Sequence, residues 1–286
     1  MLVIKTSSEL HNTIAKIKGS GDTIAFVPTM GHLHQGHLNL ISLAQQQAPV
    51  VVVSIFVNPL QFNQADDLKN YPRTLDNDLS LCESNNVDIV FIPSVSEIYS
   101  ENTESARLEL PQLSRLSTII EGAARPDHFS GVVTVVKIFF DLVQPDFAVF
   151  GKKDFQQLLI IKKMVEILKL PVKIISAETT RETDGLAMSS RNSKLSQGER
   201  HQAAQLYDVL TSIGNQINSG NTNFTELAES GLSRLVNLGF KPDYLMVCDS
   251  NDLQASSDNN QPNRVILVAV WLGNTRLIDN LTVSVS

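Results

Sequence analysis

The chain has 286 residues, of which 42% are hydrophobic and 19% are charged, and its formal net charge is -7. The length permits one large domain or two smaller ones, and the negative charge argues against a general binder of nucleic acid or membrane surfaces. Cys82 and Cys248 form no C-x-x-C pair, which argues against a disulfide framework and a cysteine-based zinc site. The N-terminus has no signal-peptide-like stretch and the longest apolar runs are too short or too interrupted to span a bilayer, so we expect a cytoplasmic protein.

The first 177 residues alternate between strand and helix patterns. Strands are predicted at residues 2–4, 23–27, 50–57, 88–92, 147–150 and 172–175, and helices at 8–18, 38–46, 75–85, 131–142 and 155–170. Pro28 is expected to stop the strand at 23–27, and residues 94–129 are expected to form a long polar connection. The run at 50–57 is almost continuously apolar, which is typical of a strand buried on both faces of a parallel sheet. The alternation predicts an α/β fold with a Rossmann-like doubly wound parallel sheet, whose ligands bind beyond the carboxyl ends of the strands.

Beyond Ala177 the sequence becomes polar and rich in turn residues, so we predict one domain at residues 1–177 and a second at 178–286. The second is expected to be a smaller α/β domain. Its helices are predicted at 196–217 and 224–238, its strands at 244–248, 265–271 and 277–283, and an exposed loop at 256–263.

The segment from Phe26 to His37 is the most informative stretch of the chain. A buried strand pattern is followed by two glycines, three histidines within six positions, and then a helical pattern from Leu38. A helix N-terminus presents unpaired N–H groups and a partial positive charge, which suits an anion such as phosphate. Gly36 permits close approach of the backbone, and an imidazole such as that of His37 can donate to the same anion. The segment therefore predicts an anion site.

Two further segments carry cations beside turn residues. Gly151-Lys152-Lys153-Asp154 follows a predicted strand, and a lysine there can reach a phosphate as a point charge. Met188-Ser189-Ser190-Arg191 combines hydroxyl donors with a planar cation, a set that suits a polyphosphate. The amides of Asn58, Gln61 and Gln157 could orient a small polar substrate, and Arg125 and His128 could bracket one. Alone, the segment at 151–154 is about equally compatible with a solvated charge run, and a plain polar loop is the better interpretation of the segment at 188–191.

Two other classes of protein fit part of this pattern. His32-x-His34 after a strand is a pattern found in metal-dependent hydrolases. However, the later strand ends carry no further carboxylate or histidine ligands, and the chain does not show the eight βα units of such a barrel. A non-catalytic nucleotide-binding module would explain the glycines and the helix N-terminus. A module of this kind would not account for the clustered His, Lys, Arg and amide groups.

Taken together, the segments resemble the pantothenate synthetase (pantoate–beta-alanine ligase) family of the H-x-G-H nucleotidyltransferase superfamily. The resemblance covers most of residues 20–195. It rests on Pro-Thr-Met-Gly-x-Leu-His-x-Gly-His at 28–37, Phe-Val-Asn-Pro-x-Gln-Phe at 56–62, Tyr-Pro-Arg-Thr at 71–74, Arg-Pro-x-His-Phe at 125–129, Phe-Gly-x-Lys-Asp-Phe-Gln-Gln at 150–157 and Arg-Glu-x-Asp-Gly-Leu-Ala-Met-Ser-Ser-Arg-Asn at 181–192.

The resemblance implies a two-step ligation of (R)-pantoate and beta-alanine to pantothenate, in the coenzyme A pathway. ATP would first adenylate pantoate with release of pyrophosphate, and the beta-alanine amine would then displace AMP. It implies a catalytic domain at 1–177, a lid domain at 178–286 and a homodimer through the N-terminal domain. Mg²⁺ would be held mainly by the ATP phosphates, so no protein metal ligand is assigned.

The resemblance also implies roles for individual residues. The catalytic residues would be His37, His34 and Lys153. The ATP site would comprise Met30, Gly31, His32, Leu33, His34, Gln35, Gly36, His37, Gly151, Lys152, Lys153, Asp154, Thr180, Met188, Ser189, Ser190 and Arg191. The pantoate site would comprise Gln61, Gln157, Val132, Val135, Val136 and Phe62, and Gln61 would also bind beta-alanine. The chain departs from the family pattern at His32, Gln35, Lys152, Asp127 and Ser130.

Overall fold

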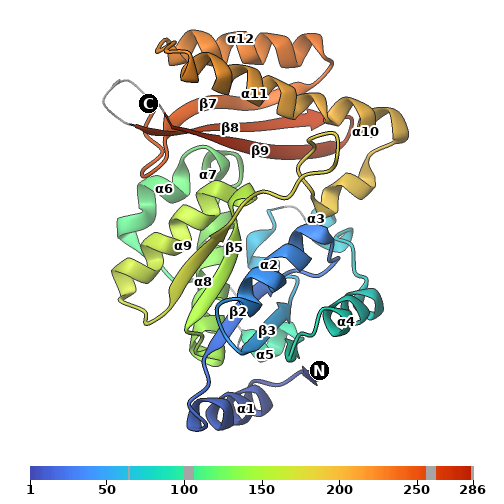
Figure 1. Ribbon diagram of the computed structural model, residues 1–286, viewed down its shortest axis with the longest axis vertical. Coiled ribbons are helices and arrows are strands. Elements are labelled where there is room, and N and C mark those ends of the chain that lie inside the picture. The colour runs from blue at the N-terminus through green and yellow to red at the C-terminus, as the bar shows by residue number, and fades with distance from the viewer. Residues whose placement is uncertain (64, 100–105, 256–261, 285–286) are drawn as a thin grey trace. The chain divides into compact units, whose positions relative to one another are not determined.

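The computed structural model describes residues 1–63, 65–99, 106–255 and 262–284 (Figure 1). These residues form two compact units, one of Met1–Lys152 and Gln156–Glu178 and the other of Lys153–Phe155 and Thr179–Ser286. The inclusion of Lys153–Phe155 in the second unit has no counterpart in the sequence pattern. Most of the loop expected at 256–263, and part of the connection at 94–129, lie outside the described residues.

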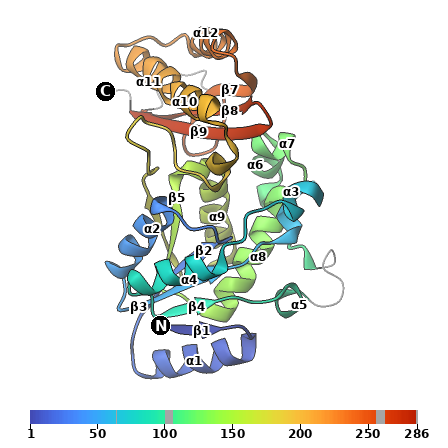
Figure 2. The ribbon, with the colours of Figure 1, turned by 90° about the vertical axis from the view of Figure 1, so that its right-hand side faces the viewer.

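The first unit contains a six-stranded parallel sheet, which confirms the predicted doubly wound architecture (Figure 2). Its strands are β1 (Leu2–Ile4), β2 (Ile24–Thr29), β3 (Val50–Ile55), β4 (Ile89–Phe91), β5 (Phe147–Gly151) and β6 (Lys173–Ala177). Their order is β1-β4-β3-β2-β5-β6, and every pairing is parallel. The carboxyl ends of the central strands β3, β2 and β5 therefore meet at one edge of the sheet.

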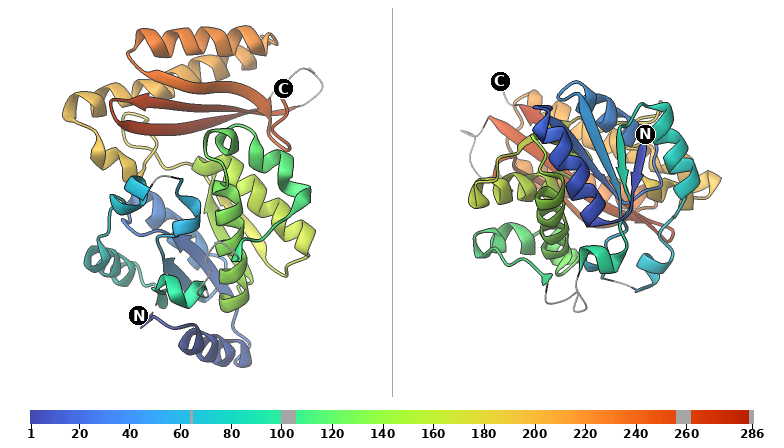
Figure 3. Two further views of the ribbon diagram at one scale, coloured as in Figure 1. Left: turned by 180° about the vertical axis from the view of Figure 1, so that it is seen from behind. Right: turned by 90° about the horizontal axis from the view of Figure 1, so that it is seen from below.

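Helices cover both faces of this sheet (Figure 3). The helices that begin in the first unit are α1 (Ser7–Gly19), α2 (Gln35–Gln45), α3 (Ala65–Lys69), α4 (Leu75–Ser84), α5 (Val95–Ile98), α6 (Ser114–Thr118), α7 (Glu121–Ala124) and α8 (His128–Val143). Helix α9 (Phe155–Leu168), which continues in this unit from Gln156, and the 3-10 turns η1 (Pro59–Gln61) and η3 (Pro111–Leu113) complete it. The 3-10 turn η4 (Lys152–Asp154) is divided between the two units after Lys152. Because strand side chains alternate in direction, Val27 packs with Ile41 of α2 while Phe26 meets the ring of Phe139 of α8.

Two sequence-based boundaries were wrong. Strand β2 continues through Pro28 to Thr29, because its pairing with β5 involves only Ala25 and Phe26 and Pro28 has a partner strand on one side alone. Helix α2 begins at Gln35 rather than at Leu38. The described part of the long polar connection predicted at 94–129 contains the short helices α5, α6 and α7.

The second unit contains a three-stranded antiparallel sheet of β7 (Lys241–Asp249), β8 (Asn263–Leu272) and β9 (Thr275–Ser284). Its helices are α10 (Gln197–Ala203), α11 (Gln205–Asn218) and α12 (Phe224–Asn237), preceded by the 3-10 turn η5 (Ser190–Lys194). The single helix predicted at 196–217 is therefore interrupted at Ala204. One sheet face shares an apolar core with α11 and α12, which confirms a smaller C-terminal domain (Figure 1). Across the described ranges, no helix combines the length and apolar character that a membrane span requires.

Asp146 ties the start of β2 to helix α1 and to the turn before β5. Its carboxylate accepts hydrogen bonds from Lys18 Nζ at 2.6 Å and from the Ile24 N–H at 2.7 Å. Burial raises the pKa of Asp146, but Lys18 and the backbone donors outweigh that effect and leave the pKa below its ordinary value of 3.8. Ionised Asp146 therefore stabilises the folded state.

We expect Asp146→Asn to lower stability at pH 7 and to match the wild type once the pH has fallen well below 3.8. A carboxyl whose folded-state pKa is depressed contributes stability above its unfolded-state pKa, and the contribution is lost as pH falls through the folded-state value. Urea unfolding across this pH range measures the difference. Asp141→Asn is the control, because Asp141 pairs with Lys137 within one exposed helix turn. A loss in Asp146→Asn that is the same at every pH would contradict the assignment.

Candidate functional site

The turn that follows β2 is held by a buried hydroxyl. Thr29 Oγ1 donates to the Ser54 carbonyl at 2.7 Å and accepts from the Gly31 N–H at 3.1 Å. Gly31 has a φ of +78°, and a Cβ there would lie 3.0 Å from Asp78 Oδ2 and 3.1 Å from Ile55 Cγ2. Only glycine combines this backbone conformation with such close neighbours.

Asp78 supports the same turn by accepting hydrogen bonds from its backbone, a role that the sequence did not predict. The side chain is 1% exposed, and its two oxygens accept from the N–H groups of His32 and Leu33, both at 2.8 Å. Thr74 Oγ1 also donates to it at 3.1 Å and lies 3.3 Å from His32 Nδ1. Among the described residues there is no group of three or more His, Cys, Asp or Glu side chains that could hold a metal ion.

His34 and His37 close the N-terminus of α2. His34 is the N-cap residue, and its Nδ1 accepts from the Gly36 N–H at 3.1 Å. His37 Nδ1 accepts from the His34 N–H at 3.3 Å, and the two ring centroids are 4.2 Å apart. A ring nitrogen that accepts carries no proton, so each neutral imidazole has its N–H on Nε2. The sequence pattern placed the helix start three residues late, because Leu38 is the first apolar position of the helical pattern and the turn between His34 and Leu38 is polar.

These two imidazoles can stabilise negative charge. A pair of Nε2–H donors at the positive end of a helix dipole favours an anion, and most strongly one whose charge grows during reaction. Met30, Gly31, His32 and Leu33 form the turn before them, and Gln35 and Gly36 begin the helix. The predicted residues 30–37 thus form the turn after β2 and the first residues of α2.

An amide cluster follows β3. Gln61, the last residue of η1, is 9% exposed, and its Nε2 lies 3.0 Å from the Met30 sulfur. Asn58 Nδ2 donates to Gln61 Oε1 and to the Gly131 carbonyl, both at 3.1 Å. Asn58 Oδ1 accepts from Tyr99 Oη at 2.7 Å and from the Leu60 N–H at 3.2 Å. All four hydrogen-bonding positions of Asn58 are therefore occupied within the protein. Asn58 supports Gln61, and the suggestion that it orients a substrate was wrong.

Arg125 and His128 also support Gln61. His128 Nδ1 lies 2.8 Å from the Gln61 carbonyl oxygen, and Arg125 Nη2 donates to the same oxygen at 3.1 Å. Arg125 Nη1 lies 3.4 Å from His128 Nε2. An Nδ1–H tautomer of His128 satisfies both contacts of its ring. His128 is 7% exposed, whereas Pro126 and Asp127 of the same segment lie at the surface.

Helix α8 presses closely on η1 and carries the apolar residues predicted beside Gln61. Val132, Val135 and Val136 are buried, and the Phe62 ring packs edge-on against Tyr71. A Cβ on Gly131 would lie only 2.3 Å from the Leu60 carbonyl oxygen. Because the contact is with backbone, either the helix or η1 would have to move.

We expect Gly131→Ala to lower the free energy of unfolding by about 1–3 kcal/mol, the usual cost of forcing an atom into a packed site. Gly198→Ala, in helix α10, is the control because a Cβ there meets nothing within 4 Å. It should leave stability unchanged or raise it by up to about 1 kcal/mol. Urea unfolding measures both variants, and equal stability of the two would contradict the close approach of α8.

Two adjacent glutamines at the start of α9 differ in surroundings. Gln156 is 4% exposed, and its Nε2 donates to the carbonyls of Leu116 and Ile119 while its Oε1 accepts from the Glu121 N–H. Gln157 is half-buried, and its side chain has no hydrogen-bond partner among the residues that the structure describes. Gln156 therefore supports the fold, and the Gln157 amide takes no part in it.

The remaining predicted residues lie in or next to η4, or belong to the second unit. Gly151 ends β5, and Lys152 pairs with Glu178 in the first unit. Lys153 Nζ lies 4.0 Å from Asp154 Oδ1. Thr180 accepts from the Met188 N–H at 2.9 Å, which closes a hairpin over residues 180–188. Ser189 caps η5 by accepting from the Arg191 N–H at 3.3 Å, and Ser190 is buried.

Comparison with known proteins gives consistent matches over the whole chain. The family model described as Pantoate-beta-alanine ligase matches residues 2–282. A curated relative from Schizosaccharomyces pombe, named Pantoate--beta-alanine ligase, is 44% identical over 286 residues and covers 100% of both chains. The crystal structure of pantothenate synthetase from Thermus thermophilus is 40% identical with a TM-score of 0.89, covering 98% of this chain and 99% of that one. The structure of pantoate-beta-alanine ligase from Francisella tularensis, complexed with beta-gamma ATP and beta-alanine, is 35% identical with a TM-score of 0.80, covering 98% of this chain and 97% of that one.

Proposed function

The chain belongs to the pantoate–beta-alanine ligase family, and from this premise we propose that it condenses (R)-pantoate with beta-alanine at the expense of ATP. The products are pantothenate, AMP and pyrophosphate, and the intermediate is an enzyme-bound pantoyl adenylate. The observation that carries the proposal is the pair of imidazoles at the start of α2, whose Nδ1 atoms both accept from backbone N–H groups. Each neutral ring then has its N–H on Nε2. The binding of ATP and beta-alanine by the Francisella tularensis relative supports it.

In the first step a pantoate carboxylate oxygen attacks the α-phosphorus of ATP. A new P–O bond forms, the bond to the β-phosphate oxygen breaks, and pyrophosphate leaves with the electron pair. Negative charge accumulates on the non-bridging oxygens in the transition state. The Nε2–H groups of His34 and His37 and the N-terminus of α2 stabilise that charge. The residues from Met30 to His37 line the ATP, with His32 turned toward Thr74.

In the second step the beta-alanine amine attacks the acyl carbon of the adenylate. A C–N bond forms, the nitrogen loses a proton, and the acyl C–O bond breaks to release AMP. Gln61 is the proposed contact of beta-alanine and, with Gln157, of pantoate. A neutral amide can orient both molecules without adding charge. The pantoate methyl groups then pack on Val132, Val135, Val136 and Phe62.

The remaining ATP contacts are proposed from the motifs. Lys153 neutralises the α-phosphate region as a compact point charge, and Lys152 lies beside it in sequence. Gly151 and Asp154 bind the ribose, and the Thr180 backbone binds the adenine. Met188, Ser189, Ser190 and Arg191 bind the β- and γ-phosphates with hydroxyl, backbone and guanidinium donors.

We further propose that ATP binds with Mg²⁺, that the chain forms a homodimer and that it is located in the cytoplasm. As the family resemblance implies, the ion would be held mainly by phosphate oxygens and water. The ion would neutralise phosphate charge as pyrophosphate leaves. Dimerisation through the N-terminal unit and the C-terminal unit acting as a lid are expectations from the family resemblance.

AMP release by the purified protein tests the function. We expect AMP when ATP, pantoate and beta-alanine are all present, and pantoate-dependent exchange of pyrophosphate into ATP without beta-alanine. No AMP from the complete mixture would refute the proposal. ATP binding without turnover would favour a binding module, and stoichiometric zinc by elemental analysis would favour a metal-dependent hydrolase.

A further inference from the structure

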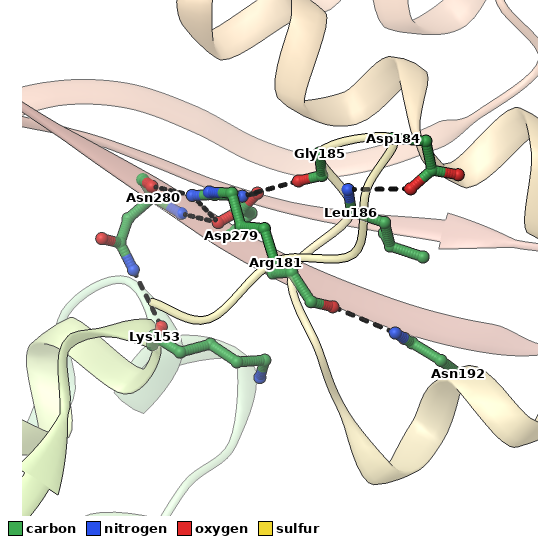
Figure 4. Close-up of polar contacts among 9 residues, drawn as sticks. Lys153, Arg181, Asp184, Gly185, Leu186, Asn192, Asp279 and Asn280 are labelled. Atoms are coloured by element: carbon green, nitrogen blue, oxygen red, sulfur yellow. Dashed lines mark hydrogen bonds and ion pairs between the residues drawn. The ribbon is translucent and has the colours of Figure 1, made fainter. Parts of the chain in front are cut away.

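Two consecutive residues of β9, Asp279 and Asn280, are polar and buried, with exposures of 3% and 5% (Figure 4). Consecutive side chains of a strand point to opposite faces of the sheet. Asp279 lies on the same face as Leu277 and Val283, which belong to the core shared with the helices. Burying a polar side chain is costly unless it is hydrogen-bonded, so the partners of these two residues indicate why they are there.

Asp279 binds Arg181 through two parallel hydrogen bonds. Arg181 Nη1 donates to Asp279 Oδ2 at 2.6 Å, and Nη2 donates to Oδ1 at 3.0 Å. The same guanidinium donates to the carbonyls of Gly185 and Asn280, both at 3.1 Å, and lies 3.7 Å from the centroid of the Tyr207 ring. Its four Nη hydrogens are therefore all engaged, and such a planar fork leaves one orientation for the residue. Burial raises the pKa of Asp279, and the Arg181 guanidinium opposes that effect.

Arg181 lies at the base of the hairpin that ends in the Met188–Arg191 segment. Arg181 and Ala187 form a β-bridge, and the Met188 N–H donates to the Thr180 carbonyl at 2.9 Å. Within the loop, Arg181 holds the Gly185 carbonyl. Because Arg181 is anchored to Asp279, β9 fixes both the base and the tip of this hairpin (Figure 4).

Asn280 holds the other cationic segment of the second unit. Its Nδ2 donates to the Lys153 carbonyl at 2.8 Å, across 127 positions in sequence. The Asn280 N–H donates to Asp279 Oδ1 at 2.7 Å, and the Asn280 carbonyl accepts from Arg181. The two anchors are thus joined through the backbone of one dipeptide.

We propose that Asp279 and Asn280 are positioning residues for the groups of the second unit that bind the ATP phosphates. Asp279 acts through Arg181 on Met188–Arg191, and Asn280 acts on Lys153. The inference rests on the proposed function, in which these two segments bind ATP. Segments held in place before the nucleotide arrives lose less conformational entropy on binding, so affinity for ATP is higher. A buried ion pair that served stability alone would not change ATP affinity selectively.

Calorimetry with α,β-methylene-ATP tests the proposal on the full chain. Asn280→Ala should weaken binding about 10-fold, the effect of losing roughly one hydrogen bond, while the KM for pantoate stays within about 2-fold. Thr282→Ala is the matched control, because Thr282 is exposed and lies two residues further along the same face of β9. Asp279→Asn, which keeps the side-chain size, should weaken nucleotide binding in the same way and provides the comparison if Asn280→Ala does not fold.

A double variant separates positioning from general damage. In a Lys153→Ala background, Asn280→Ala should cause no further loss of nucleotide affinity, because the side chain that Asn280 positions is already gone. If the two substitutions instead lowered nucleotide affinity independently, so that their fold-losses multiplied in the double variant, the proposal would be overturned. So would a lowered thermal midpoint with unchanged nucleotide affinity, or an equal weakening for pantoate. If the wild type bound the analogue but released no AMP, only the proposed function would be contradicted. The comparison of analogue affinity between the wild type and the variants would still test whether Asp279 and Asn280 position the nucleotide-binding segments.

Discussion

Replacing His37 with alanine is expected to lower kcat for AMP formation at least ~100-fold, without unfolding the protein. The Nε2–H of His37 is proposed to donate to an α-phosphate oxygen whose charge grows in the transition state. An interaction that strengthens only at that point affects kcat more than KM. His11→Ala is the control, because His11 lies exposed on α1.

The alanine variant also removes a hydrogen bond of the helix cap, and two further substitutions separate that effect. His37→Asn places an acceptor near the position of Nδ1, which accepts from the His34 N–H, but has no donor at Nε2. His37→Gln places a donor near Nε2. If charge stabilisation is the main role, the asparagine variant should be almost as slow as alanine and the glutamine variant should recover part of the rate. Near-normal turnover in His37→Asn would show that the cap alone matters.

The parallel sheet could be predicted because its signal is local. The almost unbroken apolar run of 50–57 reports burial on both faces, and β3 lies inside the sheet between β2 and β4. The errors at β2 and α2 have a common cause. Whether Pro28 ends a strand depends on whether a neighbouring strand would have to accept a hydrogen bond from the N–H that proline lacks. Whether His34 begins a helix depends on a side-chain hydrogen bond. Neither fact is encoded in a hydrophobic pattern.

The candidate site was predictable where its residues are contiguous in sequence. His34 and His37 lie in one motif, and their proximity follows from a single helix turn. The supports of the site were missed because they come from distant segments. Asp78 accepts from the N–H of His32, which lies 46 positions earlier in the sequence. His128 contacts the carbonyl of Gln61, which lies 67 positions earlier. Contacts of this kind depend on the packed fold, so residue type alone suggests a surface role for them.

Lys153→Ala is expected to lower kcat/KM for ATP at least ~100-fold, because a compact cation beside the α-phosphate region would be lost. The Lys153 side chain is 19% exposed, so its charge is only partly screened by solvent. Steady-state rates at varied ATP, with pantoate and beta-alanine saturating, measure the effect. Lys163→Ala is the control, because Lys163 pairs with Glu166 on the exposed side of α9.

Lys153→Arg distinguishes charge from shape. Arginine keeps the positive charge but replaces a point donor with a wide planar fork, so partial recovery is expected if neutralisation of phosphate charge is the main contribution. A variant as slow as alanine would mean that the position of the single donor decides the rate. That outcome would also make the Asn280 hydrogen bond to the Lys153 backbone more important, since it bears directly on where that donor lies. Wild-type kcat/KM in Lys153→Ala would remove Lys153 from the site.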